Sequence, residues 1–134
     1  MIIIGPTTFE KKNLKKLVPN NNVLKSAFMF SYSGTKNRNR NYALYNNGKL
    51  TGFALTTNEK PILYLDLIVI DKEHKSKGYG QRLMARIKNN AKKNGFKRIN
   101  LSTVNNKHTK NFYNLQGFTK TPNQPLNSSL SLLL

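Results

Sequence analysis

The sequence predicts a single domain of mixed α/β class. In its second half, two apolar strand-like segments are each followed by a segment with helical spacing and then by a further strand. In its first half, an Asn-Gly pair joins two short apolar segments. A chain of 134 residues is long enough for one domain with a modest core, so we expect residues 1–134 to form one unit.

The first part of the chain is expected to contain one strand and two helices. Residues 1–4 are apolar and are interpreted as a strand. Thr7 and Glu10 have the spacing of a capping box, which predicts that a helix begins there. Residues 23–32 are interpreted as a short second helix, and residues 33–41, which are polar and basic, as a loop.

A β-hairpin is predicted next. Residues 42–45 and 50–57 are strand-like and flank Asn47 and Gly48. Asn-Gly favours a two-residue hairpin turn because both residues tolerate positive φ. A second turn at residues 58–61 leads into the following strand, so we expect an antiparallel meander.

The strongest signal in the chain is an apolar strand followed by a glycine-containing turn and a helix. The strand covers residues 62–70, and Gly78 and Gly80 open the helix. The free N–H groups and the dipole at a helix start suit a phosphate group. The alternative is an ordinary strand–helix turn in which the glycines allow close packing. The predicted apolar face of the helix consists of Leu83, Met84, Ile87 and Ala91.

The last third of the chain predicts a second strand–helix–strand unit. Residues 97–103 alternate as a strand, and residues 106–116 form a helix that ends at Gly117. Phe118 is expected to begin another strand, and residues 126–134 to form a terminal edge strand.

The chain is strongly basic, with 23 Lys and Arg against five acids and a net charge of +18. One interpretation is a polyanionic partner, either nucleic acid or a phosphorylated ligand. The other is codon composition, because the 18 lysines and 20 asparagines are both encoded by A/T-rich codons. In either case the surface should attract an anionic cofactor.

Several classes of site are excluded or unexpected. The absence of cysteine excludes disulfides, thiolate metal sites and a cysteine nucleophile. No segment approaches the ~20 apolar residues of a membrane span, and no signal peptide is recognised. We therefore expect an intracellular, cytoplasmic protein without a membrane partner or a metal centre.

A first motif resembles a known family. Lys75-x-x-Gly78-x-Gly80, placed between a strand and a helix, resembles motif A of the GNAT (Gcn5-related N-acetyltransferase) superfamily, whose pattern is Gln/Arg-x-x-Gly-x-Gly/Ala. It is neither a Rossmann fingerprint nor a P-loop, which need other glycine spacings. Lys75 departs from the usual Gln or Arg, and a lysine lacks the bidentate fork of arginine.

A second motif follows at the expected distance. Asn106 precedes Tyr113 by seven residues, and Gly117 and Phe118 follow, which resembles motif B of the same family. The resemblance spans nearly the whole chain. It implies the GNAT fold, with a mixed central sheet of about six or seven strands flanked by about four helices.

The resemblance implies acetyl-CoA as the co-substrate. The loop amides would hold the pyrophosphate, where a side chain at either glycine would block the approach, and the main chain of the preceding strand would pair with the pantetheine arm. The cofactor-binding residues expected on this basis are Ile68, Val69, Ile70, Lys75, Ser76, Lys77, Gly78, Tyr79, Gly80, Gln81 and Asn106.

Two residues are candidates for catalysis. By resemblance, Tyr113 is the general acid that protonates the CoA thiolate; the alternative is a half-buried helix aromatic. Asp66 is the only acid within the apolar strand and shares a face with Tyr64, so it is interpreted either as the general base or as a structural hydrogen-bond acceptor. Ordered water is a third candidate for the base. Glu73, His74 and His108 are expected at the surface.

The acceptor is expected to be a primary amine on a small molecule or a protein. The segments that shape the acceptor site in the family, residues 7–40 and 122–134, contain only one acid, Glu10. This disfavours polyamines and histone tails and favours a neutral or anionic amine. The competing hypotheses are a basic nucleic-acid-binding module and a CoA-binding protein without turnover. A homodimer through the C-terminal strands is a further expectation from the family.

Overall fold

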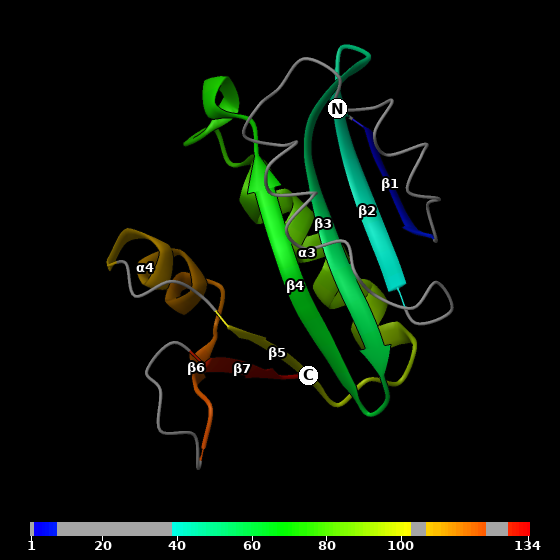
Figure 1. Ribbon diagram of the computed structural model, residues 1–134, viewed down its shortest axis with the longest axis vertical. Coiled ribbons are helices and arrows are strands. Elements are labelled where there is room, and N and C mark those ends of the chain that lie inside the picture. The colour runs from blue at the N-terminus through cyan, green and yellow to red at the C-terminus, as the bar shows by residue number, and fades with distance from the viewer. Residues whose placement is uncertain (1, 8–38, 103–106, 123–128) are drawn as a thin grey trace.

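The computed structural model describes residues 2–7, 39–102, 107–122 and 129–134 (Figure 1). Seven strands in these residues form one sheet in the order β1-β2-β3-β4-β5-β7-β6. The strands are β1 (Ile2–Thr7), β2 (Asn39–Asn46), β3 (Lys49–Glu59), β4 (Ile62–Ile70), β5 (Arg98–Ser102), β6 (Thr119–Lys120) and β7 (Ser129–Leu133). The helices are the 3₁₀ turn η1 (Lys72–His74), α3 (Tyr79–Lys93) and α4 (Lys107–Leu115).

The sheet is mixed, because β4 and β5 are parallel while the other neighbouring pairs are antiparallel. The predicted fold class and strand number are confirmed. Two of the expected helices, near residues 7–18 and 23–32, lie outside the described residues.

The first strand is longer than predicted. It continues through Gly5 and Pro6 to Thr7, with a cis peptide bond before the proline. Proline is tolerated because β1 is an edge strand of the described sheet, where a missing N–H breaks no ladder. The proposed capping residue Thr7 is therefore a strand residue, and Glu10 lies outside the described residues.

The Asn-Gly hairpin forms as predicted. Asn47 has a φ of 52° and Gly48 a φ of 76°, the left-handed values that this turn requires. Both strands exceed their predicted lengths. Residues 39–41, predicted as the end of a loop, pair with residues 55–57 of β3 because the long hairpin carries a partner strand alongside them.

An extra residue in β4 changes which of its side chains enter the core. Leu55 of β3 pairs with Leu67, but the next residue of β3 pairs with Leu65, so Asp66 is bulged out of the ladder. Before the bulge, Leu65 lies in the core, and after it Ile68 packs there. A regular strand would have turned Leu67 inward instead.

Strands β4 and β5 pair only over their first parts. The parallel ladder extends from Ile62 opposite Arg98 to Leu65 opposite Leu101. Beyond that point the two strands diverge (Figure 1). The C-terminal half of β4 therefore keeps β3 as its neighbour on one side and has no partner strand on the other among the described residues.

The sequence predicted that the C-terminal strand lies at the edge of the sheet, but in the structure it lies between two other strands. It pairs with β5 on one side and with β6 on the other, so the two-residue β6 forms that edge of the described sheet. A chain of side-chain hydrogen bonds crosses the three strands. The Ser131 hydroxyl donates to Asn100 and lies 2.8 Å from the Thr121 hydroxyl, which favours the central position of β7.

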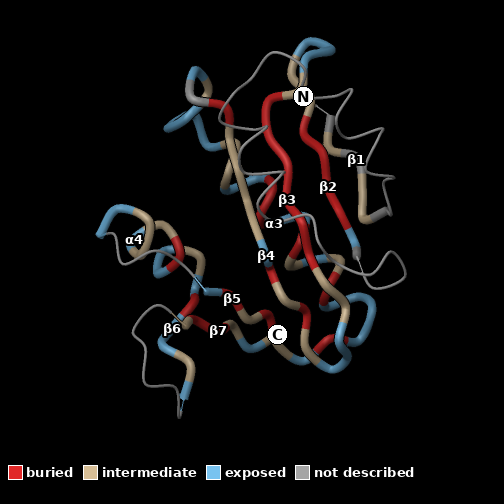
Figure 2. Tube along the Cα trace, in the orientation of Figure 1, coloured by how far each residue is buried: buried red, intermediate tan, exposed pale blue. Residues whose placement is uncertain are grey.

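The core lies between the sheet and α3. The predicted apolar face of this helix is buried, with Leu83, Met84 and Ile87 inaccessible to solvent. Buried residues follow β2 and β3 and the sheet-facing side of α3 (Figure 2). No helix in the described part of the chain is long and apolar enough to cross a membrane.

A glycine with positive φ bounds α3 at each end. Gly78 precedes the helix with a φ of 81°, and Gly95 follows it with a φ of 84°. The predicted stop at Asn94 and Gly95 is confirmed, because the Phe96 N–H bonds back to the Ala91 carbonyl at 3.0 Å.

We predict that Gly78→Ala and Gly95→Ala each lower the free energy of unfolding by about 1–2 kcal/mol, because an alanine is strained at positive φ. Gly80→Ala is the matched control. Gly80 is helical, and an added Cβ would meet nothing closer than 3.5 Å, so its effect should stay within about 0.5 kcal/mol. Urea unfolding of the three variants measures this. Equal stability of all three would contradict it.

Candidate functional site

A cavity of about 470 Å³ lies beside the C-terminal half of β4, beyond the last residue of β4 that pairs with β5. Its walls come from the C-terminal half of β4, the loop that leads into α3, and one face of α4. The lining residues are Ile68, Ile70, His74, Lys75, Ser76, Gly78, Gly80, Gln81, His108, Thr109, Asn111, Phe112, Tyr113, Leu115 and Gln116. The cavity therefore brings together the two sequence motifs, which lie on different helices.

The loop before α3 and the first turn of the helix line this cavity. Ser76 and Gly78 both have positive φ, which turns the chain sharply into the helix. The first intrahelical bond runs from Arg82 N to Gly78 O at 3.1 Å. The amides before Arg82 at the helix start have no intrahelical acceptor, so the loop can receive an anion.

The two glycines of the motif have different structural roles, which the sequence alone did not distinguish. Gly78 is required by its left-handed backbone, and open space surrounds its Cα. Gly80 has ordinary helical geometry, and a Cβ there would contact Phe112 at 3.5 Å and Ile70 at 3.7 Å. A bare Cα at Gly80 thus keeps the passage between β4 and α4 open.

Most of the predicted cofactor-binding residues line the cavity. The side chains of Val69, Lys77 and Tyr79 do not, although they belong to the same strand and loop. Val69 alternates away from Ile68 and Ile70. The Tyr79 hydroxyl instead accepts a hydrogen bond from Asn46 Nδ2 at 3.2 Å. Asn106 lies outside the described residues.

Tyr113 is a buried residue at the inner end of the cavity. It is 8% exposed, and its ring packs against those of Phe112 and Phe118 at centroid distances of 5.2 and 5.7 Å. Burial raises the pKa of Tyr113 to about 12. The phenol therefore remains protonated at neutral pH and keeps its hydrogen-bond donor.

Asp66 lies at the bulge and outside the cavity lining. Its carboxylate accepts a hydrogen bond from the Thr57 hydroxyl at 2.5 Å. The residue is exposed as a whole, yet partial burial of the carboxylate raises its pKa, and the bond from Thr57 acts in the opposite direction. Thr57 is the register partner of Tyr64, so Asp66 and Tyr64 share the predicted face.

His74 was expected at the surface but is half-buried and lines the cavity. Its Nδ1 lies 3.5 Å from a carboxylate oxygen of Asp71, and its ring lies 5.8 Å from that of Tyr79. Asp71 is itself buried and its N–H bonds to the Thr51 carbonyl, which fixes the turn. The spacing of three residues between Asp71 and His74 in a short turn was the sequence signal that could have predicted their contact.

The face of α4 that lines the cavity was also missed. His108, Thr109 and Phe112 follow helical spacing with Tyr113, and Gln116 comes directly after the helix, so these residues lie on the cavity side of α4. His108 is exposed, as predicted, while its helix position places it at the cavity rim. The spacing of these residues from Tyr113 was the signal that could have found them.

The sequence model of the acetyltransferase (GNAT) family matches residues 15–118. No curated protein sequence matches the chain. Among solved structures, the PaiA N-acetyltransferase of Thermoplasma acidophilum in complex with coenzyme A is similar, with 16% identity, a TM-score of 0.73 and coverage of 100% of each chain.

Two further solved structures share the fold. The ribosomal-protein-S18-alanine N-acetyltransferase of Escherichia coli has 20% identity and a TM-score of 0.73, over 98% of this chain and 92% of that one. Tetrahymena Gcn5 has 16% identity and a TM-score of 0.65, over 92% and 82%.

The family match covers most of the chain and both halves of the cavity. The resemblance found in the two motifs is confirmed, as is acetyl-CoA, the acetyl donor of the family, as co-substrate. The chain belongs to the acetyltransferase (GNAT) family.

Proposed function

We propose that this protein transfers the acetyl group of acetyl-CoA to a primary amine by direct attack of the amine on the thioester. The observation that carries the proposal is the cavity at the separation of β4 and β5. It joins an anion-receiving loop, an unpaired strand edge and a buried phenol within one space of about 470 Å³.

The loop and the strand edge suit different parts of the cofactor. The free amides between Lys75 and Gln81 receive the pyrophosphate, and the Lys75 ammonium at the cavity wall adds positive charge. The main chain of Ile68–Ile70 pairs with the amide groups of the pantetheine arm, because no strand occupies that edge among the described residues. The cofactor-binding role of Asn106 is proposed from the sequence motif alone.

Tyr113 acts as the general acid. When the tetrahedral intermediate collapses, the C–S bond breaks and the sulfur gains negative charge, which the phenol proton neutralises. A tyrosine with a pKa of about 12 is a weak acid toward an exposed thiolate. However, burial also disfavours the charged form of the CoA sulfur, so it raises the pKa of the thiol that receives the proton. Proton transfer from the phenol to a buried thiolate is therefore easier than transfer to an exposed one.

Asp66 or an ordered water removes the proton from the attacking amine. The raised pKa of Asp66 supports the base role, because a carboxylate of higher pKa is a stronger base. The hydrogen bond from Thr57 supports a purely structural role. A base role predicts that the pKa of Asp66 sets the acid limb of the pH–rate profile, whereas a structural role predicts no such dependence.

The acceptor is a neutral or anionic amine on a small molecule or a protein. This preference rests on the scarcity of acids in residues 7–40 and 122–134, the segments expected to form the acceptor site. With a single carboxylate, these segments would attract a polycation only weakly. A turnover assay against a broad amine panel, with release of free CoA thiol as the signal, tests the proposal directly. Cofactor binding without thiol release would favour a binding protein instead.

We predict that acetyl-CoA raises the melting temperature of the protein and that Gly80→Glu abolishes this rise. The new side chain fills the passage beside Phe112 and sets a negative charge next to the pyrophosphate. Ala85→Glu is the matched control, since it adds the same charge at an exposed position of the same helix. An unshifted wild-type protein would argue against the cofactor site.

We predict that Tyr113→Phe lowers kcat by about 10²–10⁴-fold while the affinity for acetyl-CoA stays near wild type, because only the proton donor is removed. Steady-state kinetics with the best amine of the panel measures the change. Tyr45→Phe, outside the cavity lining, should leave kcat unchanged. A Tyr113→Phe enzyme with full turnover would rule out the acid role.

We predict that Thr57→Val moves the acid limb of the pH–rate profile to higher pH. The variant removes the hydrogen bond that lowers the pKa of Asp66, so the active carboxylate is lost at a higher pH as the solution is acidified. Asp66→Asn should remove that limb. Thr119→Val, on exposed β6, is the control, and unchanged profiles in both test variants would assign the base to water.

A further inference from the structure

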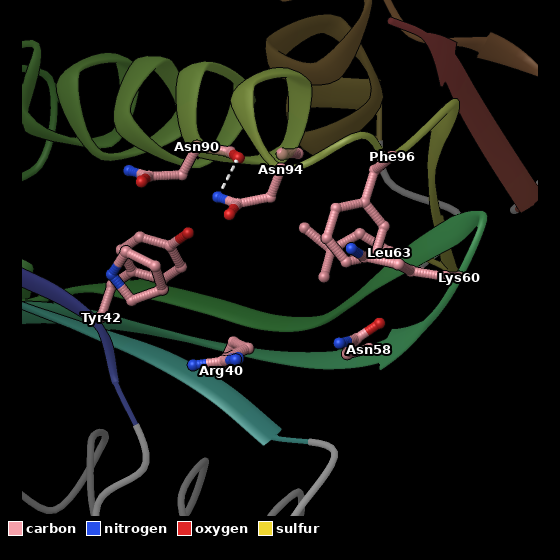
Figure 3. Close-up of a pocket in the computed structure, with 10 residues that line it drawn as sticks. Arg40, Tyr42, Asn58, Lys60, Leu63, Asn90, Asn94 and Phe96 are labelled. Atoms are coloured by element: carbon pink, nitrogen blue, oxygen red, sulfur yellow. Dashed lines mark hydrogen bonds between the residues drawn. The ribbon is translucent and has the colours of Figure 1, made fainter.

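A second, smaller pocket lies at the opposite end of α3 from the glycine loop. Its volume is about 120 Å³, and its walls come from the last turns of α3 and from the strands beneath them (Figure 3). It shares no lining residue with the cofactor cavity. It is therefore a separate feature of the molecule, which the proposed acetyl transfer does not use.

A buried hydroxyl points into this pocket. Tyr42 of β2 is only 2% exposed, and its hydroxyl faces the space between the strands and Asn94 of α3 (Figure 3). Within the described part of the chain this hydroxyl has no hydrogen-bond partner. The hydroxyl is not among the enclosed polar atoms that lack a partner, so it is accessible from the pocket and can donate a hydrogen bond to a group that enters it.

The charged residues around the hydroxyl are all cationic. Arg40 and Lys60 line the pocket, and its lining contains no carboxylate. The Lys60 ammonium is held 5.3 Å from the centre of the Phe96 ring, at the pocket wall. Burial raises the pKa of Tyr42 to about 12 despite the nearby charges of Arg86 and Arg40, so its hydroxyl remains a donor.

The C-terminal end of α3 is the negative end of its helix dipole and disfavours a nearby anion, so the cations of the pocket must outweigh it. The Asn90 carbonyl accepts bonds from the backbone N–H of Asn94 at 3.0 Å and from its side-chain amide at 2.7 Å. The Ala91 carbonyl accepts the Phe96 N–H at 3.0 Å. These bonds satisfy the carbonyls of Asn90 and Ala91 but leave the helix dipole in place.

We propose that this pocket binds a small oxyanion, with Arg40 and Lys60 supplying the charge and the Tyr42 hydroxyl donating a hydrogen bond. Phosphate and carboxylate groups have the shared chemistry that these donors recognise. The volume corresponds to about four waters at ~30 Å³ each, which admits such a group but not a nucleotide.

An NMR titration with inorganic phosphate, acetate and chloride at equal ionic strength tests the site on the full chain. The backbone amides of Leu63, Asn94 and Phe96 report on this pocket, and those of Gly78 and Gly80 report separately on the cofactor loop. We expect saturable shifts of the first group with phosphate or acetate and not with chloride. The anion that saturates at the lower concentration identifies the preferred group.

Variants assign the binding to the named side chains. Arg40→Gln and Lys60→Gln should each weaken it about tenfold at the Phe96 reporter while leaving the Gly80 reporter unchanged. Lys49→Gln is the control, because it removes the same charge from an exposed site that does not line the pocket. Tyr42→Phe should weaken binding by about threefold or more and remain folded by circular dichroism, since its hydroxyl has no partner within the described chain.

Three results would overturn the proposal. The first is the absence of saturable shifts at Leu63, Asn94 and Phe96 with either oxyanion. The second is an equal response to chloride, which would indicate only screening of the positive surface. The third is unchanged affinity in both Arg40→Gln and Lys60→Gln.

Discussion

The bulge at Asp66 is the constraint on which the site depends. One extra residue in β4 shifts the inward face, so that Ile68 and Ile70 reach the cavity. Immediately before it, at Leu65, the parallel ladder to β5 ends. Among the described residues, the C-terminal half of β4 thereby keeps β3 as its neighbour on one side and has no partner strand on the other. Bulges of this kind re-aim side chains next to functional sites.

Helix α3 connects the cavity of about 470 Å³ with the smaller pocket of about 120 Å³. Its first turn follows the left-handed Gly78 and presents free amides to the cofactor cavity, while its last turn ends before the left-handed Gly95 with its carbonyls occupied. The buried apolar face fixes the helix against the sheet. In the two proposals the N-terminal end of α3 favours an anion, whereas at the C-terminal end the cations and the Tyr42 hydroxyl must outweigh the helix dipole.

Local signals in the sequence predicted the elements that depend on a few adjacent residues. The Asn47-Gly48 turn, the glycine loop and the stop of α3 at Gly95 each need a particular backbone conformation that their own residues supply. The sequence did not predict the bulge at Asp66 or the central position of β7. Both depend on pairing between strands that are distant in the sequence, and the periodicity of a single strand does not say which strand it pairs with. Tyr113 was found because a family motif supplied the long-range information that spacing alone lacks.

The two proposed catalytic groups lie on opposite faces of the sheet. Tyr113 packs with the core on the α3 side, whereas Asp66 bonds to Thr57, whose side chain lies on the other side. In the proposed reaction the thioester must then lie between β4 and β5, where the strands have separated. The amine approaches from the Asp66 face, and the thiolate departs on the Tyr113 face, where burial keeps the phenol protonated. In the proposed reaction, acetyl transfer thus runs through the sheet from the Asp66 face to the Tyr113 face.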